Sequence, residues 1–189
     1  MSVTLRKEAG LQLPQAGTWV VDRAHSTVEF SVRHLMVSKV RGGFGTFDAS
    51  LNIAEKPEDS SVTATIDASS INTRDEKRDA HLRSADFFDT ETFPTWTFRS
   101  VGLRPTSNRT FALDGELTIR GVSKPVTLAV EYGGLVDDPW GNTRAIFSAE
   151  TEIDREEFGL TWNQALEAGG VLVSRNVTIE LEIQAVPQR

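Results

Sequence analysis

The sequence predicts an all-β protein of about eight antiparallel strands. Apolar residues alternate with polar ones through most of the chain, short runs rich in glycine, proline and asparagine separate the alternating segments, and only one stretch carries helix signals. Alternation with a period of two gives each strand one apolar and one polar face, as in antiparallel sheets that bury one side. A closed sheet leaves no edge exposed, but the order of elements alone fits a barrel and a sandwich equally well.

The predicted strands follow one another with short connections. Their alternating segments are residues 27–34, 47–53, 62–67, 96–98, 111–119, 126–131, 145–154 and 177–184. A glycine inside the fifth of these segments, Gly115, indicates a β-bulge, and residues 120–125 are expected to form a turn. Residues 17–189 are predicted to be a single domain, and residues 1–16 a flexible N-terminal arm.

Composition and charge exclude several functions. The chain has 189 residues, no cysteine and a net charge of −7, so thiolate chemistry is excluded and nucleic acid is not an expected partner. No secretory signal follows Arg6 and Lys7, and no window is apolar enough to cross a bilayer, so we expect a cytoplasmic protein without stable membrane insertion.

Residues 73–99 carry the helix signals and the densest mixture of residue types. Thr73 and Glu76 form a T-x-x-E capping box, which predicts a helix that starts there and ends near Ser84 or Ala85. The helix has few apolar residues and is followed directly by Phe87 and Phe88, which is typical of a lid over the end of an apolar body.

The run RDAHLRSADFFDTETFP, at residues 78–94, resembles the signature of the YceI-like family of lipocalin-like polyisoprenoid-binding proteins. Further resemblance lies in the segment from GTWVVD to GTFDASL, in GELTIRGVSKPVTL, in DREEFGLTWN and in VTIELEIQAV, which together extend over residues 17–186. The resemblance implies an eight-stranded antiparallel lipocalin-like barrel with a short helical segment closing one end. It also implies an apolar tunnel that holds a long-chain isoprenoid lipid, such as a prenyl quinone or a polyprenyl phosphate.

An eight-stranded barrel is just wide enough to be filled by side chains or to hold one slender ligand, so periodicity alone leaves a solid core open. If the tunnel exists, the residues expected to contact the lipid tail are apolar and face inward or belong to the lid. They are Phe30, Phe47, Phe87, Phe88, Trp96, Phe98, Phe111, Leu117, Phe147, Phe158, Trp162 and Leu181.

A polar head group would lie at the mouth of such a tunnel. The candidates to contact it are basic residues near the lid: Arg78, His81, Arg83, Arg120 and Lys124. For any single one of them, the more common role is as part of a solvated basic face or as a salt-bridge partner of Asp75, Asp79 or Asp86. Relatives in the family often pair, and exposed strand surface permits a homodimer here.

Catalysis and metal binding have weak signals. His25, His34 and His81 form no His-x-x-x-His pair or other ligand spacing, so no metal site is predicted, and no G-x-S-x-G motif is present. No cofactor is expected. The function favoured is non-enzymatic binding, transport or storage of the lipid. The alternatives are an enzyme that acts on a small lipophilic substrate with His81 as acid or base, oriented by Asp75 or Asp79, and a ligand-free stress-response scaffold.

Overall fold

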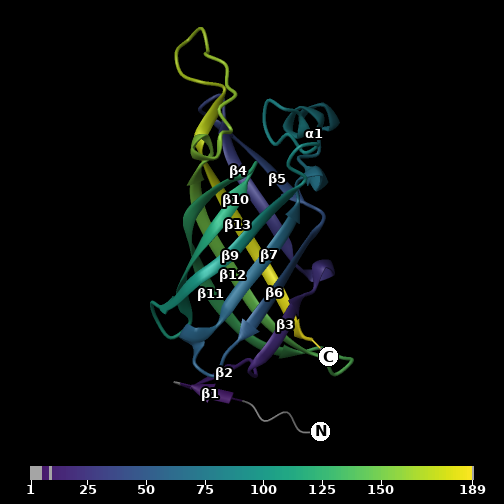
Figure 1. The fold of residues 1–189 in the computed structure, drawn as a ribbon, viewed down its shortest axis with the longest axis vertical. Helices are drawn as coiled ribbons and strands as arrows, with labels where there is room; N and C mark the ends of the chain where they lie inside the picture. The colour runs from purple at the N-terminus through teal and green to yellow at the C-terminus, as the bar shows by residue number, and fades with distance from the viewer. Residues whose placement is uncertain (1–5, 9, 189) are drawn as a thin grey trace.

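The computed structural model describes residues 6–8 and 10–188, which form a tall barrel of antiparallel strands with one α-helix at one end (Figure 1). The strands in chain order are β1 Arg6–Glu8, β2 Leu11–Leu13, β3 Gly17–Val21, β4 Thr27–His34, β5 Ser38–Phe44, β6 Phe47–Ile53, β7 Ser61–Asp67, β8 Ile71–Asn72, β9 Thr95–Pro105, β10 Thr110–Ile119, β11 Val122–Asp137, β12 Thr143–Asp154 and β13 Val173–Pro187. The helix α1 is Glu76–Arg83, and the 3₁₀ turns are η1 Arg23–His25, η2 Pro57–Asp59, η3 Ala68–Ser70 and η4 Arg155–Phe158.

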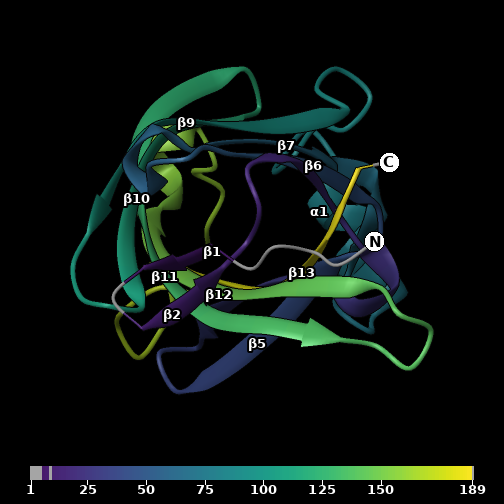
Figure 2. The same ribbon diagram turned by 90° about the horizontal axis from the view of Figure 1, so that it is seen from below.

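Within the described residues, eight strands close into a ring. Their order is β12-β11-β10-β9-β7-β6-β3-β13, and β13 pairs back to β12. The long strand β13 also pairs with β4, from which β5 and β8 extend. Figure 2, which looks along the barrel from below, shows the strands arranged around its axis. The predicted eight-stranded antiparallel barrel with a helical segment at one end is therefore confirmed.

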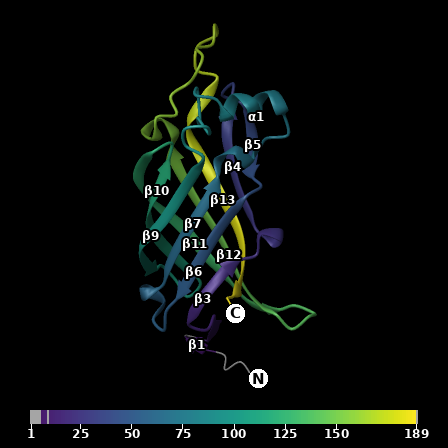
Figure 3. The ribbon, with the colours of Figure 1, turned by 45° about the vertical axis from the view of Figure 1, so that its right-hand side comes forward.

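The two ends of the barrel differ. We call the end that carries α1 and the loop of residues 159–172 the α1 end, and the opposite end the terminal end, because β1 and the end of β13 lie there (Figure 1). Figure 3 shows α1 beside the upper parts of β4 and β5. The β4–β5 connection and the start of β13 also lie at the α1 end, since His34 is the partner of Val173.

The bulge predicted at Gly115 is present, because the register of β9 against β10 shifts between Asp114 and Gly115. A Cβ atom at this position would lie 2.3 Å from Cζ of Phe98, closer than any side-chain carbon tolerates. Glycine therefore lets the Phe98 ring lie against the β10 backbone inside the barrel.

The N-cap of α1 differs from the prediction. Asp75 caps the helix and accepts hydrogen bonds from the N–H groups of Lys77 and Arg78, both at 3.1 Å, and the bond from Arg78 contributes most to lowering the pKa of Asp75. Thr73 is instead buried and bonded to Asp79. Aspartate two residues closer to the helix competes for the same amides, so the capping box does not form. The helix ends at Arg83 with Ser84 as C-cap, as predicted.

The turn predicted over residues 120–125 is shorter in the structure. Only Arg120 and Gly121 connect β10 to β11, with φ of 50° and 73°, so Ser123, Lys124 and Pro125 belong to β11. A two-residue connection with both φ values positive is typical of a tight β-hairpin. The alternation of β11 therefore begins at Val122, whereas the sequence of residues 120–125 suggested a longer turn.

The structure describes part of the arm predicted at residues 1–16, namely residues 6–8 and 10–16, whereas residues 1–5 and 9 lie outside the described part of the chain. β1 and β2 pair with each other and cross the terminal end of the barrel (Figure 2). Leu13 is buried in a cluster with Trp19, and the Tyr132 hydroxyl donates to the Gln12 carbonyl at 2.6 Å. Burial of Leu11 and Leu13 holds residues 11–13 against the barrel. The sequence does not predict this, because the apolar segment is short and polar residues surround it.

Candidate functional site

A cavity of about 320 Å³ lies inside the barrel, and we call it the tunnel. Its lining extends from Leu13 and Pro14 at the terminal end to Leu82, Phe87 and Phe88 at the α1 end. Ligand pockets in proteins occupy about 300–1,000 Å³, so the tunnel lies at the lower end of that range. Its interior is therefore not a solid core.

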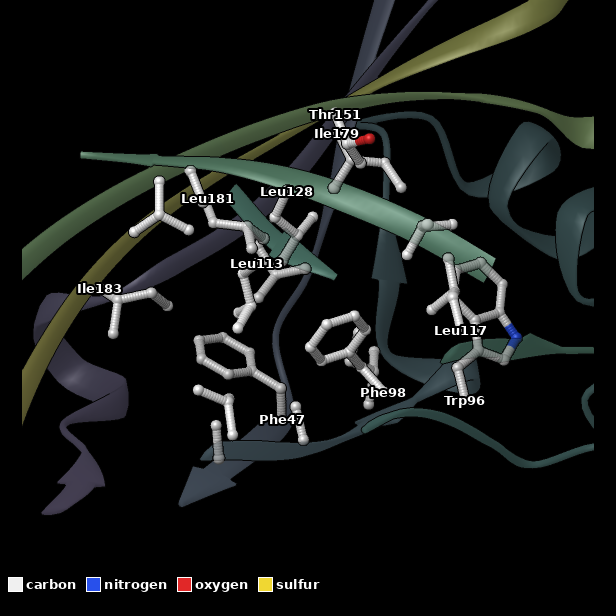
Figure 4. Close-up of a pocket in the computed structure, with 18 of the residues that line it drawn as sticks. Phe47, Trp96, Phe98, Leu113, Leu117, Leu128, Thr151, Ile179, Leu181 and Ile183 are labelled. Atoms are coloured by element: carbon white, nitrogen blue, oxygen red, sulfur yellow. The ribbon is translucent and has the colours of Figure 1, made fainter. Parts of the chain in front are cut away.

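The wall of the tunnel is formed by inward-facing apolar side chains from nearly every strand of the ring. Figure 4 shows labelled examples that point into the space from β6, β9, β10, β11, β12 and β13. They are Phe47, Trp96, Phe98, Leu113, Leu117, Leu128, Thr151, Ile179, Leu181 and Ile183. Alternation places them inward because successive side chains of a strand point to opposite faces.

Most of the residues predicted to contact a lipid tail line the tunnel. These are Phe30, Phe47, Phe87, Phe88, Trp96, Phe98, Phe111, Leu117, Phe147 and Leu181. Phe158 and Trp162 instead line a separate surface groove beside Arg120, and Phe158 is 1% exposed within the core. The alternation of β12 ends at Asp154, so it cannot predict on which side of the wall Phe158 and Trp162 lie.

Other lining residues were absent from the prediction. Leu113, Ile179 and Ile183 share a strand face with predicted residues, and Leu128 belongs to the apolar alternation of β11, so the same rule identifies all four. Arg155 carries no such signal, because a charged residue directly after a strand normally indicates the surface.

The helical lid is fixed by a buried polar cluster. The carboxylate of Asp79, 5% exposed, accepts hydrogen bonds from Thr73 N at 2.9 Å and from Thr73 Oγ1 at 2.6 Å. Arg78 donates two hydrogen bonds to Thr73, each of 2.7 Å: one from Nε to Oγ1 and one from Nη2 to the backbone carbonyl. These hydrogen bonds connect Asp79, Thr73 and Arg78, and they give α1 a defined position over the barrel end.

Aromatic rings fill the space beneath the lid. Phe44, Phe88 and Trp96 contact one another with ring centroids 4.7–6.2 Å apart. A second group joins His81 to Phe87 and Trp162, with centroids 5.1 and 4.7 Å away. His81 Nε2 also lies 2.8 Å from Asp86 Oδ2, so Asp86 orients this histidine, and the predicted partners Asp75 and Asp79 do not. His81 lies outside the set of described residues that line the tunnel.

Of the predicted head-group residues, the arginines are engaged with the protein. Arg83 donates to the carbonyls of Ser69 and Ile71, and Arg120 to those of Ala85 and Gly159. Arg78 is bonded to Thr73, as described above. Together these bonds connect the lid, η3, the β10–β11 turn and η4. Their first role is therefore to hold the α1 end together.

Lys124 is placed differently. It lies on β11 opposite Leu117, whose side chain lines the tunnel, and opposed residues in an antiparallel pair share one face of the sheet. Along β11, residues on the Lys124 side are buried or half-buried and those on the other side are exposed. Lys124 is therefore half-buried on the inner face of β11 near the α1 end, although it is not among the described residues that line the tunnel.

Arg155 adds a second cation there. It is 3% exposed and lines the tunnel. Its guanidinium donates to the carbonyl oxygens of Ser174 at 2.8 Å, Trp162 at 3.0 Å, Val173 at 3.4 Å and Leu160. Burial lowers the pKa of Arg155, although neighbouring Glu156 and Asp154 oppose this shift. The ends of the loop of residues 159–172 are thus held by one buried positive charge.

Trp96 contributes an unsatisfied donor at the same end. Its indole Nε1 is buried and has no hydrogen-bond partner among the described residues, while its ring lines the tunnel (Figure 4). Buried donors are nearly always paired in native proteins. At the α1 end the tunnel wall therefore contains one buried cation, Arg155, and one unpaired N–H, with Lys124 nearby on β11, whereas the rest of the wall is almost wholly apolar.

The described residues contain no group of three or more histidine, cysteine, aspartate or glutamate side chains arranged to hold a metal ion. Likewise, no α-helix in the described part of the chain is long and apolar enough to span a membrane.

Comparisons with known proteins agree with this architecture. The family model described as YceI-like domain matches residues 19–185. A UPF0312 protein of Staphylococcus aureus strain N315 is 41% identical over 162 residues, which cover 84% of this chain and 91% of that protein.

Among solved structures, BcnA of Burkholderia cenocepacia is 25% identical with a TM-score of 0.75, over 87% of this chain and 98% of its own. The YceI protein of Campylobacter jejuni is 29% identical with a TM-score of 0.72, over 83% and 90%. A polyisoprenoid binding domain of Saccharophagus degradans is 14% identical with a TM-score of 0.65, over 90% and 98%, and so shares the fold.

Proposed function

Because the chain belongs to the YceI-like family, we propose that it is a non-enzymatic carrier or store that binds a long-chain isoprenoid lipid in the tunnel. The observation that carries the proposal is the apolar cavity that extends between the two ends of the barrel. A ligand-free scaffold would have no need of such a cavity, which reduces packing contacts in the core. The shared fold of the polyisoprenoid binding domain supports the same ligand class.

Apolar contact alone is sufficient for affinity. Burial of one methylene contributes roughly 0.8 kcal/mol, so each five-carbon prenyl unit contributes about 4 kcal/mol before the costs of association and ordering. The practical limit of affinity, roughly 18–21 kcal/mol, would be reached with a handful of units. Such a tunnel selects its ligand by length and width, and only its polar end selects by chemistry.

The polar end supports one orientation of the ligand. Lys124, Arg155 and the free N–H of Trp96 all lie toward the α1 end, so an anionic or oxygen-rich head group is expected there, with the tail pointing toward Leu13. A phosphate or a quinone oxygen would accept hydrogen bonds from these donors.

The direct test is mass spectrometry of an organic extract from protein purified without detergent. The expected result is a prenyl lipid in stoichiometric amount, or uptake of an added prenyl quinone by protein isolated empty. Recovery of no lipid together with no uptake would overturn the proposal. No enzymatic turnover of the bound lipid is expected.

The orientation predicts the effect of Lys124→Met, which keeps the length of the side chain and removes its charge. The affinity for a polyprenyl phosphate is expected to fall about tenfold, because one charge-assisted contact is lost. The affinity for the matching uncharged polyprenol should not change. Both are measured by displacement of a fluorescent prenyl probe. Lys77→Met, on the exposed part of α1, is the matched control. Equal losses for both ligands would contradict the orientation.

A further inference from the structure

The connection between β4 and β5 exposes three large apolar residues at the α1 end. Leu35, Met36 and Val37 are 46%, 57% and 81% exposed, and we call them the hairpin tip. The tip lies against the loop of residues 159–172: Leu35 N donates to the Leu172 carbonyl at 2.9 Å, and Met36 Cγ lies 3.3 Å from where a Cβ of Gly170 would be. Val171, 37% exposed, extends the same apolar surface.

The backbone of the tip is unfavourable for its residues. Leu35 and Met36 have φ of 53° and 64°, and Val37 N donates to the His34 carbonyl at 3.2 Å. Two central residues with positive φ form the pattern of a type I′ turn, which strongly prefers asparagine and glycine. Branched or long side chains there are strained, and they also lie in water. Stability of the fold therefore does not explain these residues.

The charges around the tip are unfavourable as well. Arg33 and Lys39 are both exposed and directly opposite each other across the hairpin, where like charges repel. Arg41, further along β5, has a carboxylate partner in Glu180. In a chain with a net charge of −7, residues 30–47 contain these three cations and no acidic residue. Strain, exposed apolar surface and like-charge pairing thus coincide in one hairpin.

We propose that the hairpin tip docks on the surface of an anionic lipid bilayer. Leu35, Met36 and Val37 enter the boundary between head groups and acyl chains, while Arg33 and Lys39 bind lipid phosphates behind them. In a membrane the acyl chains lie beneath a layer of phosphates, and here the apolar tip likewise lies beyond the two cations, Arg33 and Lys39. Lipid phosphates bound between these cations would also remove their mutual repulsion.

A second exposed apolar site, at the opposite end of the barrel, favours this assignment by contrast. Trp140 is 83% exposed in the β11–β12 loop at the terminal end, close to Val136. That loop carries Asp137 and Asp138, so an anionic surface would repel it. Among the described residues, the hairpin tip is the site where three consecutive large apolar residues are exposed beside cations, whereas Val101 near Arg99 on β9 is a single exposed apolar side chain.

Docking in this way would direct the α1 end toward the bilayer, where a lipid tail could pass between membrane and tunnel. That consequence depends on the proposed function, whereas docking itself does not. The test therefore uses vesicles without any isoprenoid.

The experiment is co-flotation of the full chain with vesicles of phosphatidylcholine alone and of phosphatidylcholine mixed with phosphatidylglycerol. We expect binding to the mixed vesicles that weakens as salt is raised. Arg33→Gln with Lys39→Gln should reduce this binding about tenfold or more. Trp140→Ser is the matched control and should bind like the unaltered chain.

The decisive variant is Leu35→Asn with Met36→Gly, which supplies the residues that the turn prefers. It should lose vesicle binding while its midpoint of thermal unfolding rises, so loss of binding cannot come from unfolding. No binding by the unaltered chain, or equal binding by this variant, would overturn the proposal. A dimer in sedimentation equilibrium that the variant dissociates would also overturn it, because the tip would then be covered by a second copy.

Discussion

Replacement of Arg155 by methionine is expected to lower the free energy of unfolding by about 3–4 kcal/mol. The guanidinium satisfies the carbonyls of Leu160, Trp162, Val173 and Ser174 from a position that is almost fully buried. Methionine keeps much of the apolar contact and leaves these acceptors without their donor. Each unsatisfied buried acceptor costs about 1–3 kcal/mol, although partial hydration through the open loop reduces the sum.

Burial of the Arg155 charge opposes this loss, since desolvation lowers its pKa and makes the charged form costly. Removal of a buried charge is neutral or stabilising only when its partners are replaced as well, and here they are backbone groups that remain. Arg175→Met provides the control, because Arg175 forms exposed ion pairs with Asp154 and Glu156, and its loss should cost less than about 1 kcal/mol. Urea unfolding of both variants measures the difference. Similar values would contradict the role assigned to Arg155.

The wall of the tunnel could be predicted from the sequence because a single rule governs it. Once a strand has an apolar face, every second residue has the same environment, so Phe47, Phe98 and Leu181 follow from periodicity alone. The rule fails where strands end. Phe158 lies in η4, where the period changes, and its ring is buried outside the tunnel.

The polar end of the site could not be predicted in the same way. Whether Lys124 belongs to a turn or to a strand depends on how tightly Arg120 and Gly121 close the hairpin, which only the register of β10 and β11 decides. Arg155 is buried because the loop of residues 159–172 folds back over it, a contact between distant positions with no local signal. The choice of barrel over sandwich likewise came from the family resemblance, since alternation alone is shared by both.

Filling of the tunnel is expected to abolish lipid binding without unfolding the protein. Ala64 on β7 and Ala149 on β12 both line the cavity, and phenylalanine at both positions would occupy space that a ligand needs. Displacement of even one prenyl unit removes about 4 kcal/mol of gross contact energy, so uptake of a prenyl quinone should weaken at least about a hundredfold.

Stability should change little in the same double variant, because two effects oppose each other. Each added ring buries apolar surface worth about 2 kcal/mol, while imperfect fit inside a formed wall costs about 1–3 kcal/mol. Ala129→Phe is the control. Ala129 pairs with Glu150, which is adjacent to Ala149 on β12, but its side chain is exposed to solvent, so lipid uptake should persist.

The filled variant also separates the two proposals made for this chain. Its hairpin tip is unaltered, so binding to anionic vesicles should be retained while lipid uptake is lost. Full uptake by a folded Ala64→Phe, Ala149→Phe protein would mean that the lipid binds outside the barrel, and the assignment of the tunnel as its site would fail even if docking were confirmed.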